Sequence, residues 1–159
     1  MTKYKYAFKS DKENIAKVVG RDLEISTKKS IEMCSYIKGM QLKNCMELMN
    51  RVMTQEEAIP FRRFTEGAGH QKGKGSAKYP LKAARKFLLL LKSLEANAQN
   101  KGLNPDLRII HACAQKGAEP YHYGRKRRIK MKRTHVEIVV QEIEARKEKE
   151  TGKKVRKEK

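Results

Sequence analysis

Apolar residues recur at helical spacing in three segments of the chain. The first follows Ser26, whose hydroxyl is suited to accept a hydrogen bond from the free amides of a first turn, and it stops at Gly39. The second begins at once with one methionine-rich stripe, for which a core position is favoured over an adaptable binding groove. The third starts at Pro80 and closes at Gly102. The apolar positions are Ile31, Cys34 and Ile37, then Leu42, Cys45, Met46, Met49, Val52 and Met53, then Ala84, Phe87, Leu88, Leu91, Leu94 and Ala98.

Two further segments alternate apolar and polar residues with the period of two that is typical of strands. Residues 15–25 do so with an interruption at Gly20, which indicates a β-bulge. Residues 107–143 contain two such arms around a polar tip and predict an antiparallel hairpin. On strict alternation, one face of its first arm carries Leu107, Ile109, His111 and Cys113, and the apolar face of its second arm carries Val136, Ile138 and Val140.

Helices and strands in these segments predict an α+β fold, with three helices packed on a small antiparallel three-stranded sheet and a protruding basic β-hairpin. The chain has 159 residues, enough for one domain with tails. We assign residues 15–143 to a single α+β domain. Residues 1–14 are expected to be a tail that orders only on binding, and residues 144–159 a charged tail. The third helix is the most apolar, and we expect it between the sheet and the first two helices.

Residues 54–79 are rich in glycine and in basic side chains. We expect this segment to be a loop without order of its own, because it has too few apolar residues to bury. A nucleotide-binding loop is excluded, since the G-x-x-x-x-G-K-[ST] spacing requires a glycine at position 74, which is lysine. Phe61 and Phe64 flank two arginines, and two interpretations stay equally open for them. They stack on exposed bases, or they anchor the loop to the core.

The charge balance points to an anionic partner. Lysine and arginine number 38 against 18 acidic residues, a formal net charge of +20 at pH 7, and such self-repulsion favours binding to counter-charge. No apolar run is long enough for a membrane span, and we expect a cytosolic protein. The three cysteines lack C-x-x-C spacing, so neither a disulfide framework nor a zinc site is supported.

The predicted hairpin tip carries charge of only one sign. Residues 121–133 contain seven lysines or arginines, two tyrosines, one histidine and no carboxylate. A packed core cannot take up these charges without anionic side chains to pair with. Polyphosphate is therefore the expected partner, and if it is a folded RNA, most contacts should be made to its backbone and shape rather than to base edges.

Catalysis is not expected. His111 and Cys113 lie on one strand face, about two ligands short of a zinc site. His70, His122 and His135 lie among cations, and the basic residues 121–133 offer no carboxylate to orient a general base or to hold a metal. We expect no enzyme activity, cofactor or metal. Two rival functions are weighed: an architectural DNA-binding protein that uses the hairpin as a basic β-ribbon arm, and an RNA-modifying or RNA-cleaving enzyme.

Several motifs in fixed order resemble one family. They are Ile25-Ser26-Thr27-Lys28-Lys29, Ile37-Lys38-Gly39-Met40, Ile59-Pro60-Phe61-Arg62-Arg63-Phe64, Tyr79-Pro80-Leu81-Lys82-Ala83-Ala84, Glu95-Ala96-Asn97-Ala98 and His135-Val136-Glu137-Ile138. Together they resemble large-subunit ribosomal protein twenty-two, called seventeen in older eukaryotic naming, over roughly residues 15–143. The Pro-Phe-Arg-Arg block and its Gly-rich insert are similar to the archaeal and eukaryotic branch.

The resemblance implies a structural constituent of the cytoplasmic large ribosomal subunit, with a hairpin that lines the nascent-polypeptide exit tunnel. Its implied partners are large-subunit ribosomal RNA, neighbouring ribosomal proteins and the nascent chain; no homo-oligomer is expected. The hairpin departs from the family pattern, with fewer residues between Lys116 and Gly124-Arg125, and Tyr121 to Tyr123 where an Arg-Ala pair is common. The implied tunnel-lining residues are Tyr121, His122, Tyr123, Gly124 and Arg125. The expected rRNA-binding residues are Arg62, Arg63, His70, Lys72, Lys74, Lys78, Lys82, Lys86, Arg125, Lys126, Arg127, Arg128, Lys130, Lys132 and Arg133.

Overall fold

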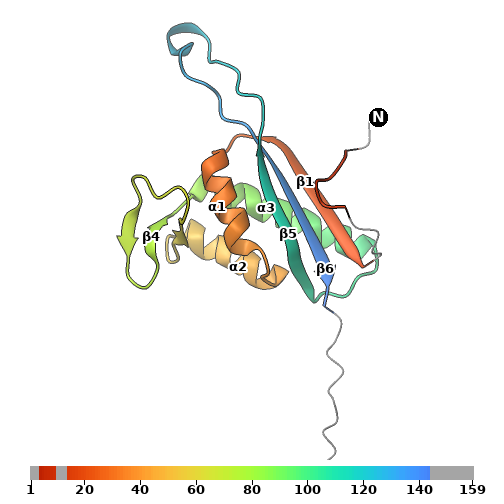
Figure 1. Cartoon of the computed structure of the whole chain (residues 1–159). Coiled ribbons are helices and arrows are strands. Elements are labelled where there is room, and N and C mark those ends of the chain that lie inside the picture. The colour runs from red at the N-terminus through yellow and green to blue at the C-terminus, as the bar shows by residue number, and fades with distance from the viewer. Residues whose placement is uncertain (1–3, 10–13, 144–159) are drawn as a thin grey trace, which may run out of the picture.

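The computed structural model describes residues 4–9 and 14–143, and the predicted C-terminal tail of residues 144–159 lies outside this range. Within it, helices and strands form an α+β fold, as predicted (Figure 1). In chain order the elements are β1 (Ile15–Leu23), α1 (Thr27–Ile37), α2 (Leu42–Met53), β2 (Ile59–Pro60), β3 (Gly69–Gln71), β4 (Gly75–Lys78), α3 (Leu81–Asn100), β5 (Leu107–Lys116), the 3-10 turn η1 (Gly124–Lys126) and β6 (Thr134–Glu142).

The main sheet has three antiparallel strands in the order β1-β6-β5, which confirms the predicted sheet. β5 and β6 pair from Leu107 with Glu142 to Lys116 with Thr134, and the chain between them extends beyond the body of the domain (Figure 1). The pairing of β1 with β6 shifts between Gly20 and Leu23, where a bulge is predicted. A Cβ on Gly20 would lie 2.9 Å from Leu90 Cδ2, so α3 packs there against bare backbone.

A second bulge in β5 changes which of its residues share a face. The pairing shifts between Ile109 and His111. Leu107 and Ile109 belong to the main core, whereas beyond the bulge Ala112 and Ala114 take the core side. His111 and Cys113 therefore point to the opposite face from Leu107 and Ile109. The strict alternation predicted for this arm is wrong at this point, because one extra residue inverts the remainder of the strand.

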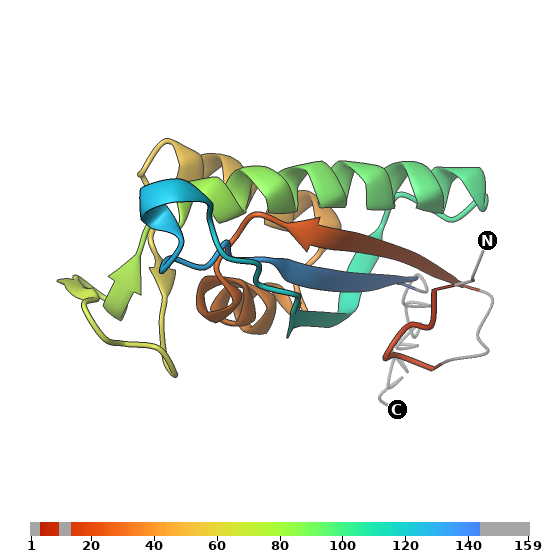
Figure 2. The ribbon, with the colours of Figure 1, turned by 90° about the horizontal axis from the view of Figure 1, so that it is seen from above.

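The helices bury their apolar sides on one face of the sheet. α1 packs against β5, α3 packs against β1, and α2 packs against α3; Figure 2 shows α3 lying along β1. The predicted position of α3 between the sheet and both other helices is wrong, because α1 contacts the sheet directly. The methionine-rich stripe of α2 is core, as favoured, with Cys45, Met49 and Val52 fully buried. Ser26 does precede α1, but its side chain makes no capping hydrogen bond.

The opposite face of the sheet is covered by residues 4–9. Tyr4 donates its hydroxyl hydrogen to the Glu137 carboxylate, and the Ala7 backbone amide donates to the same group at 2.9 Å. The Phe8 ring stacks on His111 with ring centroids 5.3 Å apart. The structure thus places this segment on the sheet, where the sequence analysis expects a tail that orders on binding. Glu137 is only 1% exposed because these residues lie over it.

Residues 59–78, which we call the basic loop, contain a second small sheet with strand order β2-β4-β3. Its strands are two to four residues long and are joined by antiparallel pairing. Gly73, in the turn between β3 and β4, and Gly75, the first residue of β4, both adopt positive φ. The expectation that this segment lacks order of its own is therefore wrong.

Candidate nucleic-acid interface

The basic loop is held to the domain by a buried carboxylate on α1. Glu32 is 4% exposed, and its Oε1 accepts hydrogen bonds from the backbone amides of Arg63 and Phe64, both at 2.7 Å. Its Oε2 accepts a third bond from the Arg62 amide at 3.2 Å. A carboxylate that satisfies three amides compensates its own burial and fixes the backbone. The Arg62 and Arg63 side chains consequently leave a rigid turn and remain exposed.

The two phenylalanines of this turn have different roles. Phe61 is 3% exposed and belongs to the core, so it anchors the loop. Phe64 is half-buried against the core, and cations lie over its ring, with Arg63 at 5.3 Å and Lys28 at 5.6 Å from the centroid. The anchoring interpretation therefore holds for Phe61 and largely for Phe64. The stacking platform expected as the alternative is not exposed here.

The basic side chains of the loop differ in whether the protein itself supplies hydrogen-bond or ion-pair partners for them. Lys74 forms an ion pair with Glu57 at 2.8 Å and also donates to the Ala58 carbonyl at 3.1 Å. The pKa of Glu57 is lowered, first through its hydrogen bond with Lys74. Lys78 donates to the backbone carbonyl of Glu66. His70 and Lys72 are exposed at the outer end of the loop. Lys74 thus has a structural role that its position in a basic segment does not reveal.

Residues 117–133, which we call the hairpin tip, are shaped mainly by hydrogen bonds between their own backbone groups. The Met131 amide donates to the Pro120 carbonyl at 2.7 Å, the His122 amide to Ile129 at 2.9 Å, and the Ile129 amide to Lys126 at 2.8 Å. Gly124 begins the 3-10 turn with φ of 63°, which glycine adopts without strain. No residue of the tip is buried. The tip is a small, closed structure without a core.

The charge of the hairpin tip is largely uncompensated by the protein. Within the described residues, six of its seven lysines and arginines between positions 121 and 133 make no ion pair. Arg133 alone does so, with Glu24 at 2.9 Å. Tyr123 is 89% exposed and Tyr121 59%. The predicted tip residues therefore present cations and aromatic rings outward, and the side chains of the domain do not supply the missing negative charge.

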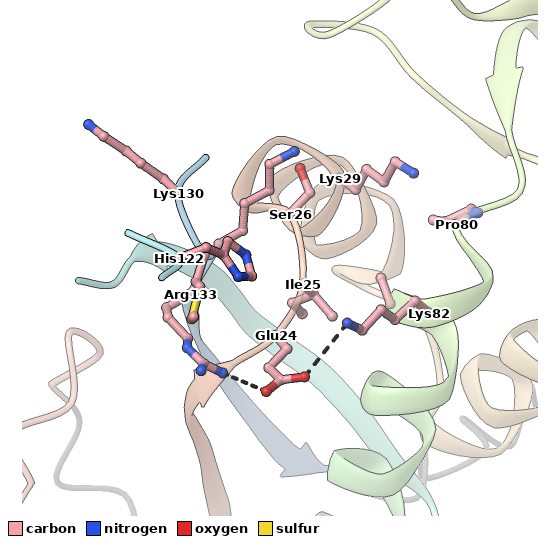
Figure 3. A pocket seen from close by; sticks show the side chains of 12 residues that line it. Glu24, Ile25, Ser26, Lys29, Pro80, Lys82, His122, Lys130 and Arg133 are labelled. Carbon is pink, nitrogen blue, oxygen red and sulfur yellow. Dashed lines mark hydrogen bonds and ion pairs between the residues drawn. The ribbon is translucent and has the colours of Figure 1, made fainter. Parts of the chain in front are cut away.

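A pocket of about 430 Å3, which we call the root pocket, lies where the tip joins the domain. Figure 3 shows Glu24 between Arg133 and Lys82, with which it forms ion pairs at 2.9 and 3.7 Å. These cations lower the pKa of the Glu24 carboxyl, Arg133 first through its hydrogen bond. The root pocket brings together five of the predicted residues: Lys82, His122, Lys130, Lys132 and Arg133. The basic loop is a separate projection of the domain (Figure 1).

Three residues that hold or line these segments are missed by the sequence analysis: Glu32 under the basic loop, Glu137 under residues 4–9, and Lys29 at the root pocket. Glu32 and Glu137 are single carboxylates within apolar patterns, and Glu32 carries no local signal because it lies off the predicted apolar stripe of its helix. Lys29 lies on the first turn of α1 and lines the root pocket. Lys29 is functionally interesting because it lies near the hairpin. That proximity comes from the tertiary fold, so the local sequence pattern does not predict it.

No cluster of three or more metal-ligating side chains occurs among residues 4–9 and 14–143. Burial raises the pKa of the Cys45 thiol to about 12 and that of Cys34 further still, so both are held as thiols. His111 Nε2 is buried and has no hydrogen-bond partner among the residues that the structure describes. Over the same described residues, no helix has the length and apolar character needed to cross a bilayer.

Comparison with known proteins places the chain among ribosomal proteins. The family model for ribosomal protein L22p/L17e matches residues 18–141. Large ribosomal subunit protein uL22 of Methanococcoides burtonii is 36% identical over 150 residues, covering 90% of this chain and 99% of its relative. The proteins of the same name from Methanosphaera stadtmanae and Ignicoccus hospitalis are 36% and 37% identical, covering 87% and 83% of this chain and 96% and 91% of theirs. These matches confirm the resemblance seen in the motifs, and the chain belongs to the ribosomal protein L22p/L17e family.

Proposed function

We propose that this protein is a structural, non-catalytic constituent of the large ribosomal subunit in the cytoplasm, and that it binds large-subunit ribosomal RNA. Family membership supports the assignment to the large ribosomal subunit, because the matched relatives are named as large-subunit proteins. The physical support is the charge of the hairpin tip, because six of its cations have no ion pair in the described part of the chain and are available to anions of another molecule. Folded RNA offers phosphates at the density that such a surface needs.

The two basic projections divide the binding task in this proposal. The basic loop offers Arg62, Arg63, His70, Lys72 and Lys78 from a fixed backbone, and the tip offers Arg125, Lys126, Arg127 and Arg128 from a protruding one. Lys82, Lys86, Lys130, Lys132 and Arg133 contact RNA around the base of the hairpin. Lys74 contributes least, because Glu57 already neutralises it. Most contacts are to phosphates and shape, which position the protein without reading sequence.

The hairpin tip also lines the path of the nascent polypeptide in this proposal. Its exposed Tyr121 and Tyr123 rings and its half-buried His122 are suited to brief contact with a passing chain, because each combines an apolar surface with a polar atom. A photo-reactive amino acid at position 123 should crosslink a stalled nascent chain in assembled ribosomes. The same group at position 89, exposed on α3, should not. Equal crosslinking from both positions would contradict the tunnel placement.

Association with the large subunit is tested by sucrose-gradient sedimentation at high salt, where a structural constituent stays with the subunit.

RNA contacts are tested by replacing Arg125, Lys126, Arg127 and Arg128 with glutamine and measuring the affinity for ribosomal RNA as a function of salt concentration. The salt slope should fall by about 0.7 to 0.9 for each phosphate that the variant no longer neutralises. A control that exchanges lysine and arginine at the same positions keeps the charge and should keep the slope. Preference for duplex DNA, with dimerisation and bending, would favour the architectural DNA-binding alternative instead.

A further inference from the structure

The root pocket joins three stretches that are far apart in the sequence. It is lined by residues 24–26 and Lys29 at the start of α1, by residues around the start of α3, and by His122 with residues 130–133 of the hairpin. Its volume of about 430 Å3 falls within the range of sites for small organic ligands. Figure 3 shows that side chains from all three stretches surround one hollow. A ligand held there would contact the domain and the hairpin at once.

The pocket has an apolar wall. Ile25 and Ala83 are each 3% exposed, Pro80 is also buried, and Met131 is half-buried. These side chains come from the start of α1, the start of α3 and the hairpin, so the fold and not a local motif assembles them. An apolar wall of this kind suits a flat ring that has left water, because ring burial releases ordered solvent from both surfaces.

The rim of the pocket is strongly basic. Lys29, Lys82, Lys130, Lys132 and Arg133 line it, and Glu24 is its one carboxylate. Glu24 pairs with Lys82 and Arg133, whereas Lys29, Lys130 and Lys132 have no ion pair within the described residues. The Glu24 contacts show that a cation of α3 and a cation of the hairpin converge on a single anionic group. Its side chain is 61% exposed, so it can turn away when another anion arrives.

We propose that the root pocket binds one unpaired nucleotide of RNA, with the base on the apolar wall and its phosphate on the basic rim. A phosphate alone would leave the wall unused, and an apolar peptide side chain would leave the rim unused. A paired base cannot enter, because its faces are stacked inside a helix, whereas a bulged or looped base is free to leave the stack. The inference rests on the proposed RNA-binding function and names a specific contact within it.

The direct test observes the methyl groups of the pocket wall by NMR in the full-length protein. A short oligoadenylate should shift the signals of Ile25, Ala83 and Met131 while leaving the exposed Leu89 methyls of α3 unchanged. The duplex of the same strand with oligouridylate, and inorganic phosphate, should move lysine signals of the rim without shifting the wall methyls. Wall methyls that respond equally to single strand and duplex, or to neither, would overturn the proposal.

A charge-neutral variant separates the pocket from general electrostatics. Ser26→Leu places an apolar side chain at the pocket and removes no side-chain cap, because Ser26 makes none. It should weaken oligoadenylate binding about tenfold and leave duplex binding unchanged. Ser93→Leu, on an exposed position of α3 outside the pocket, is the matched control. Equal affinities of the two variants for the single strand would overturn the proposal.

A second variant guards against an effect of Ser26→Leu on helix α1. Lys82→Gln removes one rim cation from a side chain that is 68% exposed, so the fold does not depend on it. It should weaken binding of the single strand more than Lys92→Gln, which removes a cation elsewhere on α3. Equal losses of affinity would contradict the site.

If the protein sediments with the large subunit but RNA does not shift its wall methyl signals, only this inference fails. If it neither sediments with the subunit nor binds ribosomal RNA, the proposed function fails with it.

Discussion

The basic loop and the hairpin tip carry similar charge but are built in different ways. The loop is fixed from inside the domain, by the Phe61 ring in the core and by the Glu32 carboxylate beneath three backbone amides. The tip has no buried residue, and its shape comes from hydrogen bonds between its own backbone groups. The basic loop therefore presents its arginines from a backbone that the core of the domain holds in place. The hairpin tip presents its cations from a backbone that does not pack into that core.

The N-terminal segment, residues 4–9, resembles the basic loop rather than the hairpin tip, because a buried carboxylate holds it to the domain. Glu137, on the opposite face of the sheet, accepts hydrogen bonds from the Tyr4 hydroxyl and the Ala7 amide and is 1% exposed. Two polypeptide segments without an apolar pattern are thus held by buried carboxylates that accept backbone amides.

The largest effect is expected at Glu32. Glu32→Ala leaves the amides of Arg62, Arg63 and Phe64 without their acceptor, which should lower the free energy of unfolding by about 3 kcal/mol. Glu32→Gln should cost less, because one amide oxygen can still accept the two bonds that Oε1 now receives. Urea denaturation measures the loss, and Glu47→Ala, an exposed carboxylate on α2, is the control. A loss no larger than that of the control would show that Glu32 does not hold the loop.

The sequence predicts the part of the fold in which each element has its own period. The three helices, the bulge at Gly20 and the presence of a three-stranded antiparallel sheet are all predicted from local apolar spacing and glycine, whereas the strand order β1-β6-β5 comes from the structure. The bulge after Ile109 does not, because an inserted residue leaves no mark in a stretch where apolar and small residues fill both registers. The observed faces of His111 and Cys113 are therefore the reverse of the predicted ones, relative to Leu107 and Ile109.

The order of the basic loop is also beyond local prediction. Its strands have only two to four residues and no alternation, and the group that fixes its first turn lies about thirty residues earlier, on α1. Likewise, the seven cations of the tip are evident from composition, but the root pocket exists only because α1, α3 and the hairpin meet. Charge is enough to name candidate residues, whereas their grouping depends on the tertiary structure.

A smaller effect is expected where Glu137 holds the N-terminal segment. Burial, followed by the hydrogen bond to Glu137, raises the pKa of Tyr4 to about 12 from its usual value of 10. The folded state thus retains the phenol proton, so this hydrogen bond stabilises the protein fully below pH 10, and its contribution disappears as the pH rises through 12. Tyrosinate absorbance, taken as the difference between wild type and Tyr4→Phe, should titrate near pH 12. Glu137→Gln should lower that midpoint and destabilise the protein by about 1 kcal/mol.

An unchanged midpoint in Glu137→Gln would mean that the segment is held by other contacts. Gln115→Glu, which adds a carboxylate at an exposed position of β5, is the control for a general effect of nearby charge. If the segment is held as the structure describes, the control leaves the Tyr4 midpoint near 12, because Tyr4 makes its hydrogen bond to Glu137 alone.

The smallest effect on folding is expected from the most conspicuous change, removal of the hairpin tip. Residues 118–132 can be replaced by Asn-Gly, the dipeptide that closes a two-residue hairpin, because Gly117 and Arg133 already face each other across the strands. Since no tip residue is buried, the free energy of unfolding should change by no more than about 0.5 kcal/mol, measured by urea denaturation. Affinity for ribosomal RNA should fall in the same protein, with a flatter salt dependence. A large loss of stability would mean that the tip supports the domain, and the contrast with the basic loop would then disappear.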